Sequence, residues 1–257
     1  MIGIIGGMGP WATADLMGKI AEETLGTRDQ DHLSTIVFSM PSEIPDRTGF
    51  LDETSALNPG DAVAGMVVRL AELGVTVAGM PCNTLHHPRI LEPILTAAAG
   101  RVHIVSIIDE TVQSVRRVVP PGAAVGVLAT LPTLRFELYA GPLRRAGFAV
   151  VHPSTELSHD VHRKAIYGPA GIKQTHGRVT DLAFETIRSA IDDLLASGAS
   201  AVILGCTELP AFQSTIERDR PATLIIDPTR ALARGLIRSF DASKLKPDAS
   251  NLRWEPR

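Results

Sequence analysis

Apolar runs of strand length alternate along the chain with segments of helical periodicity. The runs cover residues 2–5, 34–39, 76–81, 102–107, 123–128, 148–151, 200–204 and 222–226. Strands that alternate with helices form a mostly parallel sheet with helices on both faces. The pattern therefore predicts an α/β fold.

One predicted helix has a well-marked beginning and end. Asn58 is a suitable cap, Pro59 suits the first helical position, and Asp61 places a negative charge in the first turn. We expect this helix to run to Leu73 and to stop at Gly74.

Two segments with the same architecture, Leu73–Thr84 and Ser197–Glu208, lie 124 residues apart. In each, a glycine ends a helix-like segment, a buried-type strand follows, and a cysteine comes eight residues after the glycine. These cysteines, Cys82 and Cys206, are the only two in the chain.

Two further pairs occur in the same order. Residues 3–9 match residues 126–132 at an offset of 123, and residues 107–109 match residues 225–227 at an offset of 118. Matched segments at nearly one offset indicate a duplicated half. The prediction is two pseudo-symmetric lobes, each a mostly parallel sheet flanked by helices, with a ligand cleft between them.

The repeat sets the expected domain boundaries. The first lobe would contain residues 1–106 and 228–240, and the second lobe residues 107–227. Residues 241–257 lose the helical pattern. We expect this C-terminal tail to be poorly ordered or docked against a partner.

Composition is that of an ordinary soluble globular protein, with 44% apolar and 21% charged residues in a chain of 257. A net charge of −3 offers no basic surface for nucleic acid or an anionic membrane. No apolar run reaches the length of a membrane helix, no secretory signal is evident, and two cysteines make no disulfide scaffold. We expect a cytoplasmic protein.

Four residues lie at or just past the carboxyl ends of predicted strands: Met8, Cys82, Thr130 and Cys206. Ligands of parallel sheets bind at this edge, so we expect the four to converge on one cleft. A thiol just before a helix N-terminus has a lowered pKa, and each cysteine could be a thiolate near neutral pH.

Two thiols on opposite walls suit a reaction that removes a proton from one face of a carbon and returns a proton to the other face. Racemisation and epimerisation have this requirement. A cysteine at the end of a buried strand is often only a small core residue. The polar neighbours Asn83 and Thr84 in one segment, and Thr207 and Glu208 in the other, argue against that interpretation.

Other signals are weaker. The glycines of residues 3–9 do not have dinucleotide-binding spacing, and the pairs His86-His87 and His159-x-x-His162 lack a matching ligand cluster, so we expect no metal site. A Cys-His hydrolase built from Cys82 and His86 would leave the second cysteine unexplained. We interpret His86 as a helix-face residue.

The chain resembles the aspartate/glutamate racemase family, most closely its aspartate racemase branch. The resemblance rests on six segments: residues 3–10, 28–32, 44–48, 80–84, 205–208 and 226–228. It implies a cofactor-independent enzyme with a catalytic cysteine in each of two α/β lobes, here Cys82 and Cys206.

The resemblance also implies substrate-binding residues. Asn83, Thr84, Thr207 and Glu208 would bind the α-carboxylate and the ammonium group. Arg47 would hold the side-chain carboxylate, a role that a guanidinium fork suits.

Two further positions are compared with the family pattern. Lys173, in a segment that differs in length from the pattern, would help Arg47. Thr130 keeps its place although Leu131 and Pro132 replace the usual Thr-Gly.

The resulting hypothesis is a pyridoxal phosphate-independent racemase of aspartate, or of glutamate, acting as a homodimer on a small amino-acid substrate. Alternatives are another cysteine-dependent isomerase or decarboxylase of small dicarboxylates, and a small-ligand binding protein.

Overall fold

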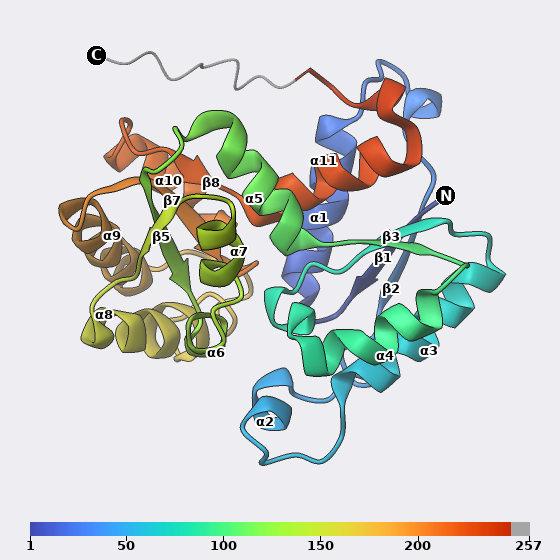
Figure 1. Cartoon of the computed structure of the whole chain (residues 1–257), viewed down its shortest axis with the longest axis horizontal. Coiled ribbons are helices and arrows are strands. Elements are labelled where there is room, and N and C mark those ends of the chain that lie inside the picture. The colour runs from blue at the N-terminus through green and yellow to red at the C-terminus, as the bar shows by residue number, and fades with distance from the viewer. Residues whose placement is uncertain (248–257) are drawn as a thin grey trace. The chain divides into compact units, whose positions relative to one another are not determined.

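Two four-stranded parallel sheets organise the chain (Figure 1). The first has the strand order β2-β1-β3-β4 and the second the order β6-β5-β7-β8. The strands are β1 (Ile2–Gly6), β2 (Thr35–Ser39), β3 (Val77–Gly79), β4 (His103–Val105), β5 (Ala124–Ala129), β6 (Ala149–Val151), β7 (Ala199–Gly205) and β8 (Ile225–Ile226). Every strand falls on a predicted apolar run. The two sheets repeat one order, which confirms the predicted α/β fold with two similar halves.

Helices connect the strands in both halves. The longer ones are α1 (Pro10–Glu23), α3 (Pro59–Glu72), α4 (Pro88–Ala98), α5 (Ile107–Val118), α9 (Asp181–Ala196) and α11 (Pro228–Asp241). The shorter ones are α2 (Arg47–Leu51), α6 (Leu131–Arg135), α7 (Ala140–Arg145), α8 (Thr155–Asp160) and α10 (Gln213–Asp219). Single turns of other helix types are η1 (Asp29–Asp31), η2 (Asn83–His86), η4 (Leu209–Phe212) and η5 (Ala242–Lys244), and η3 (Val161–Tyr167) is a π-helix.

The computed structural model describes residues 1–247 and divides into two compact units. Unit 1 contains Met1–Glu110 and the described residues from Thr229 onward, and unit 2 contains Thr111–Pro228. The helix after the last strand of each sheet therefore crosses the division. Helix α5 begins in unit 1 and continues in unit 2, whereas nearly all of α11 belongs to unit 1.

Close packing explains why α11 belongs with the first sheet. A Cβ on Gly79 of β3 would lie only 3.0–3.1 Å from side-chain atoms of Leu232 and Leu236 in α11. Arg238 of α11 also pairs with Glu110 at the beginning of α5. The absence of a side chain at Gly79 thus lets the helix approach the strand closely.

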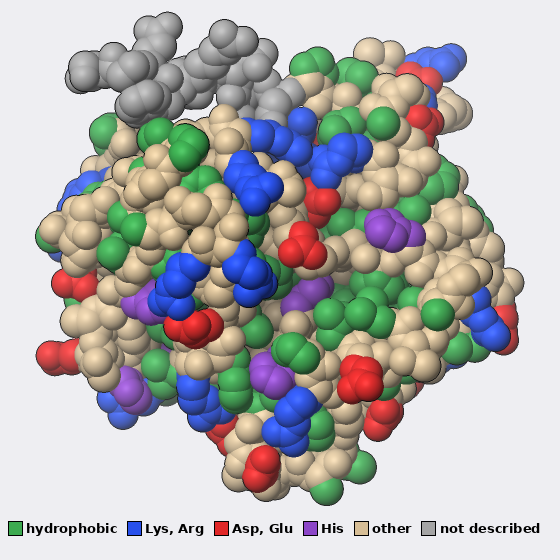
Figure 2. All heavy atoms as spheres, viewed as in Figure 1, with side chains coloured by type: hydrophobic (Ala, Val, Ile, Leu, Met, Phe, Trp, Pro, Cys, Tyr) green, Lys and Arg blue, Asp and Glu red, His purple; other side chains and the backbone are tan. Residues whose placement is uncertain are grey.

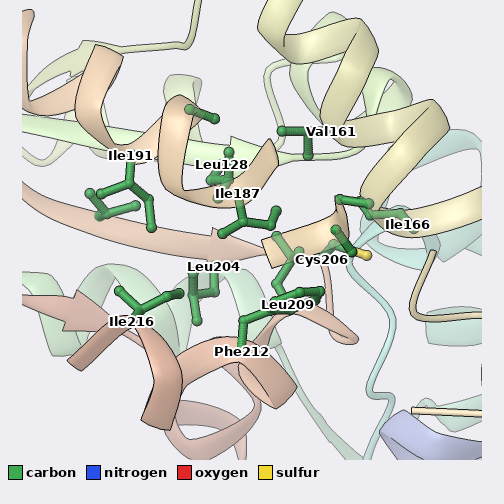
Figure 3. Packing of buried hydrophobic residues seen from close by; sticks show 14 of the residues in the cluster. Leu128, Val161, Ile166, Ile187, Ile191, Leu204, Cys206, Leu209, Phe212 and Ile216 are labelled. Atoms are coloured by element: carbon green, nitrogen blue, oxygen red, sulfur yellow. The ribbon is translucent and has the colours of Figure 1, made fainter. Parts of the chain in front are cut away.

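In unit 2, the core lies between β7 and helix α9 and continues to the end of the strand. Buried side chains such as Ile187, Ile191 and Leu204 form this cluster, and Cys206 belongs to it. Figure 3 shows Cys206 at one end of the cluster, beside Ile166 and Leu209. The second cysteine therefore lies where the apolar core ends and the polar strand end begins.

Helix α3 confirms the predicted boundaries. The side chain of Asn58 accepts a hydrogen bond from the backbone N–H of Gly60, and Pro59 is the first residue of the helix. Leu73 caps the helix, and Gly74 follows with a φ of +81°, a conformation that glycine adopts readily.

One expected repeat pair is wrong. Ile225 and Ile226 form strand β8, whereas Ile107 and Ile108 begin helix α5. The strand that corresponds to β8 is β4, because both are the outer neighbours of the cysteine-bearing strands. The two Ile-Ile-Asp segments, residues 107–109 and 225–227, thus occupy different elements.

The first part of the expected tail is ordered against its own chain, which corrects the expectation of disorder or a partner. Leu245 makes an antiparallel bridge with Thr24, and the backbone N–H of Lys246 donates to the carbonyl of Glu23. Arg234 of α11 donates to the carbonyl of Lys246. The rest of the tail lies outside the described residues.

Both signs of charge occur on the face of the molecule that Figure 2 draws. Figure 2 shows Lys and Arg side chains interspersed with Asp and Glu side chains on one face of the molecule. Among the described residues, no helix has the length and apolar character that crossing a membrane requires.

Candidate active site

The first cluster of predicted site residues lies at the carboxyl edge of the unit 1 sheet. Strands β1 and β3 pair in parallel, with Ile4 opposite Gly79. Met8 follows β1 and Cys82 follows β3, so both lie at the same edge. Both side chains are buried, with Met8 4% and Cys82 5% exposed.

Thr13 of α1 holds the loop that carries Met8. Its hydroxyl accepts a hydrogen bond from the backbone N–H of Gly7 at 2.9 Å and donates to the carbonyl of Gly9 at 3.0 Å. The Nη2 of Arg47 reaches the carbonyl of Met8 at 3.5 Å. The structure therefore places Arg47, at the beginning of α2, beside the same strand-end loop.

Cys82 is followed directly by the single turn η2, which contains Asn83 and Thr84. Asn83 is buried and Thr84 is partly exposed. Helix α2 contacts η2 within unit 1, which brings the element of Arg47 next to the turn after Cys82.

His86 is not the helix-face residue that we expected. Its ring is buried, with Nδ1 3.0 Å from the carbonyl oxygen of Cys82. The backbone N–H of Ile107 donates to Nε2 at 3.4 Å. Burial lowers the pKa of His86 to about 4, so the ring is neutral near neutral pH. The expectation failed because residues 83–86 form a 3₁₀ turn, in which the ring folds back on the backbone.

The second cluster lies at the carboxyl edge of the unit 2 sheet. Strands β5 and β7 pair in parallel, with Ala129 opposite Gly205. Thr130 follows β5, and Cys206 follows β7. The hydroxyl groups of Thr130 and Thr133 lie 3.1 Å apart, and both side chains are buried.

Cys206, Glu208 and Lys173 form a continuous polar chain in this cluster. The thiol of Cys206 donates to Oε2 of Glu208 at 3.0 Å. The Nζ of Lys173 pairs with Oε1 of the same carboxylate. The lysine ammonium also lies 5.6 Å from the centre of the Tyr167 ring. Lys173 therefore lies in the second cluster, although its segment departs from the family pattern.

Cys206 is not the ready thiolate that we expected. Burial raises the pKa of its thiol well above the usual value, and the negative charge of Glu208 raises it further, while Lys173 acts in the opposite direction. The turn after Cys206 is η4, a single 3₁₀ turn, and so short an element supplies little of the dipole on which the expectation relied.

The sequence reasoning missed Tyr139 in this cluster. Its ring is 1% exposed, and a Cβ on Gly205 would lie 3.3 Å from its Cε2 atom. Tyr139 thus packs against the residue that precedes Cys206, and burial raises the pKa of its hydroxyl strongly. Its position after the short helix α6 gives no periodic signal by which it could have been found.

The two clusters have the same plan: a cysteine follows the third strand in sheet order, and a loop with a buried side chain, Met8 or Thr130, follows the second strand. A family model, described as Asp/Glu/Hydantoin racemase, matches residues 5–236. The chain belongs to the Asp/Glu/Hydantoin racemase family. This confirms the family inferred from the sequence motifs and the prediction of a racemase.

Individual relatives agree with this assignment. The broad specificity amino-acid racemase RacX of Bacillus subtilis is 28% identical over 93% of this chain and 98% of its own length. The Picrophilus torridus aspartate racemase is 29% identical, covers 95% of both chains and superposes with a TM-score of 0.72. The glutamate racemase of Francisella tularensis shares the fold, with a TM-score of 0.65 and 16% identity over 97% of this chain and 84% of its own.

Proposed function

We propose that the protein interconverts L- and D-aspartate without pyridoxal phosphate, by a two-base reaction in which Cys82 and Cys206 carry the protons. The observation that supports this most is the placement of one cysteine at the equivalent strand end of each of two repeated sheets. Both cysteines, which lie in the described part of the chain, are free of disulfide bonds.

The reaction needs one acid and one base. The thiolate of one cysteine takes the α-proton, which leaves a carbanion next to the substrate carboxylate, and the thiol of the other cysteine gives a proton to the opposite face. The reverse reaction exchanges the two roles. The two clusters, each with one cysteine at an equivalent strand end, suit this exchange.

Polar groups in both clusters are available for the substrate. We assign the α-carboxylate and ammonium group to Asn83, Thr84 and Thr207, and the side-chain carboxylate to Arg47 and Lys173. Two cations for one carboxylate favour a dicarboxylic amino acid over an apolar one. The aspartate racemase of Picrophilus torridus supports aspartate, while the broad specificity of the Bacillus subtilis relative favours a wider set as the second candidate.

Incubation in deuterated water tests the proposal. Aspartate, glutamate and alanine are each supplied as the L-isomer, loss of the α-proton is followed by NMR, and the D-isomer is measured by chiral chromatography. We expect aspartate to react fastest. Loss of substrate without a D-isomer would indicate a decarboxylase, and saturable binding without exchange would indicate a binding protein.

Cysteine variants test the mechanism. Cys82→Ala and Cys206→Ala should each abolish racemisation, because either direction needs both proton carriers. Circular dichroism should show that both variants keep the wild-type fold. A variant that racemises aspartate at a near-normal rate would exclude its cysteine as a proton carrier.

A further inference from the structure

Arg89 reaches from the beginning of α4 to the segment that carries Arg47. The central carbon of its guanidinium group lies 5.0 Å from the centre of the Phe50 ring in α2. Its Nη1 lies 3.5 Å from Oε1 of Glu53, two residues after that helix ends. Two contacts of different kinds therefore join one arginine to α2 and to the loop that follows it.

The backbone of Arg89 is fixed where helices α3 and α4 begin. The side-chain amide of Asn58 donates from Nδ2 to the carbonyl of Arg89 at 3.0 Å. A Cβ on Gly60 would collide with the carbonyl oxygen of Ile90, so the two helices meet without a side chain between them at this point. Arg89 thus projects from a closely packed helix junction.

Helix α2, in contrast, has little of its own to hold it. It contains five residues, of which Leu51 is buried. A helix this short is not stable in water by itself, so α2 depends on contacts with neighbouring elements. Arg47 is its first residue, with Nη2 at the carbonyl of Met8. Whatever holds α2 in place therefore also positions Arg47.

The backbone of Glu53 indicates that its side chain has a role. Glu53 has a φ of +59°, the left-handed conformation that glycine or asparagine usually adopts after a helix. A glutamate is less stable in this conformation than a glycine, because its Cβ lies close to the backbone carbonyl. The ion pair with Arg89 gives a reason for a charged residue at this position.

Resting on the proposed function, we propose that Arg89 is a positioning residue, which clasps α2 and so holds Arg47 in place for the side-chain carboxylate of the substrate. The contacts of Arg89 with Phe50 and Glu53 form what we call the α2 clasp. The side chains of Arg89 and Glu53 are 51% and 77% exposed, and contacts between such groups are weak. The clasp therefore opens and closes readily, and its closed form keeps Arg47 at the loop of Met8.

A two-state clasp has a defined kinetic signature. When only the closed form binds the substrate well, the apparent affinity falls with the fraction of closed protein. A variant that opens the clasp should raise KM, whereas kcat should change little because saturating substrate restores the closed form.

Hydrogen exchange in the ligand-free protein tests the clasp without any substrate. The backbone N–H groups of Asp52 and Thr54 donate to carbonyls of the same segment, and their exchange reports its opening. We expect Arg89→Met to accelerate exchange in residues 50–55 severalfold. Arg144→Met is the matched control, because Arg144 pairs in unit 2 with Glu137, another exposed glutamate with a positive φ. Unchanged exchange of residues 50–55 in Arg89→Met would overturn the clasp.

Glu53→Asn separates the ion pair from the backbone conformation. Asparagine adopts the left-handed conformation readily but has no charge to pair with Arg89. We expect it to accelerate exchange and to raise KM, as Arg89→Met does. Arg89→Lys keeps a cation for both contacts and should restore part of the effect. Wild-type exchange and KM in Glu53→Asn would show that Glu53 only shapes the turn, which would overturn its part in the clasp.

Kinetics with aspartate test the link to Arg47. Arg89→Met should raise KM roughly fivefold, the size expected when two weak contacts are lost. In an Arg47→Ala background the same change should have no further effect, because the residue that it positions is absent. An equal rise in that background, or faster exchange with an unchanged KM, would overturn the positioning role. A wild type that does not racemise aspartate would contradict the proposed function, and exchange alone would then decide whether the clasp exists.

Discussion

His86 holds the backbone of Cys82 through a single hydrogen bond, with its Nδ1 3.0 Å from the carbonyl oxygen of that residue. The other ring nitrogen accepts from the backbone N–H of Ile107 at 3.4 Å. A neutral ring with its proton on Nδ1 satisfies both contacts. A protonated ring would direct an N–H at the N–H of Ile107. The turn after the first cysteine is therefore matched to an uncharged histidine.

This relationship predicts a loss of stability in weak acid. The pKa of His86 is about 4 in the folded protein and near 6.5 in the unfolded chain, so between these values only the unfolded state binds the proton. The free energy of unfolding therefore keeps its full value above pH 6.5. It falls by roughly 3 kcal/mol as the pH falls toward 4. Denaturant unfolding at a series of pH values measures it.

Variants identify the source of that acid sensitivity. His86→Gln should flatten the pH dependence of the free energy of unfolding, because the amide does not titrate. The variant should be less stable than the wild type near neutral pH. His159→Gln, at an exposed histidine, should leave the wild-type curve unchanged. Parallel curves for the wild type and His86→Gln would show that another group is responsible.

The two inner strands of each sheet could be predicted because burial on both faces makes them continuous apolar runs. Ile2–Gly6 is buried along its whole length, and Ala199–Gly205 at all but one position. Helix α3 could be predicted because its cap and its terminating glycine are local signals. Because each cysteine directly follows one of these strands in the sequence, its place at the end of the strand could be predicted as well.

Contacts between distant residues could not be predicted in this way. Lys173 and Glu208 are 35 residues apart, and no periodicity relates them. The protonation of Cys206 depends on burial, which follows from packing rather than from its neighbours in sequence. The ring of His86 was misjudged for a similar reason, because its partner Ile107 lies 21 residues away.

The hydroxyl of Thr13 supports the loop that carries Met8, and its removal gives a second prediction. Thr13→Val keeps the shape of the side chain but loses the acceptor for Gly7 and the donor to Gly9. A buried N–H left without its partner costs about 1–3 kcal/mol. We expect a corresponding drop in the free energy of unfolding, with a drop in kcat/KM as the loop shifts. Thr13→Ser keeps the hydroxyl and should stay near the wild type, so equal effects of the two variants would contradict this role.

Arg47 provides the third prediction, which concerns specificity. Its guanidinium lies at the loop of Met8, and its helix contacts the turn after Cys82. If it pairs with the side-chain carboxylate of aspartate, Arg47→Ala should lower kcat/KM for aspartate by the equivalent of roughly 2–5 kcal/mol, because that carboxylate loses one of its two cationic partners. Alanine, which has no such carboxylate, should lose far less.

The comparison between the two substrates separates specificity from general damage. Arg47→Lys keeps the charge but loses the bidentate fork, so it should recover only part of the activity on aspartate. Arg101→Ala, at an exposed position after α4, should change neither rate. Because α2 is a short helix in the connection between β2 and α3, we expect it to move when ligand binds. Equal losses for aspartate and alanine, or none for either, would remove Arg47 from the substrate site.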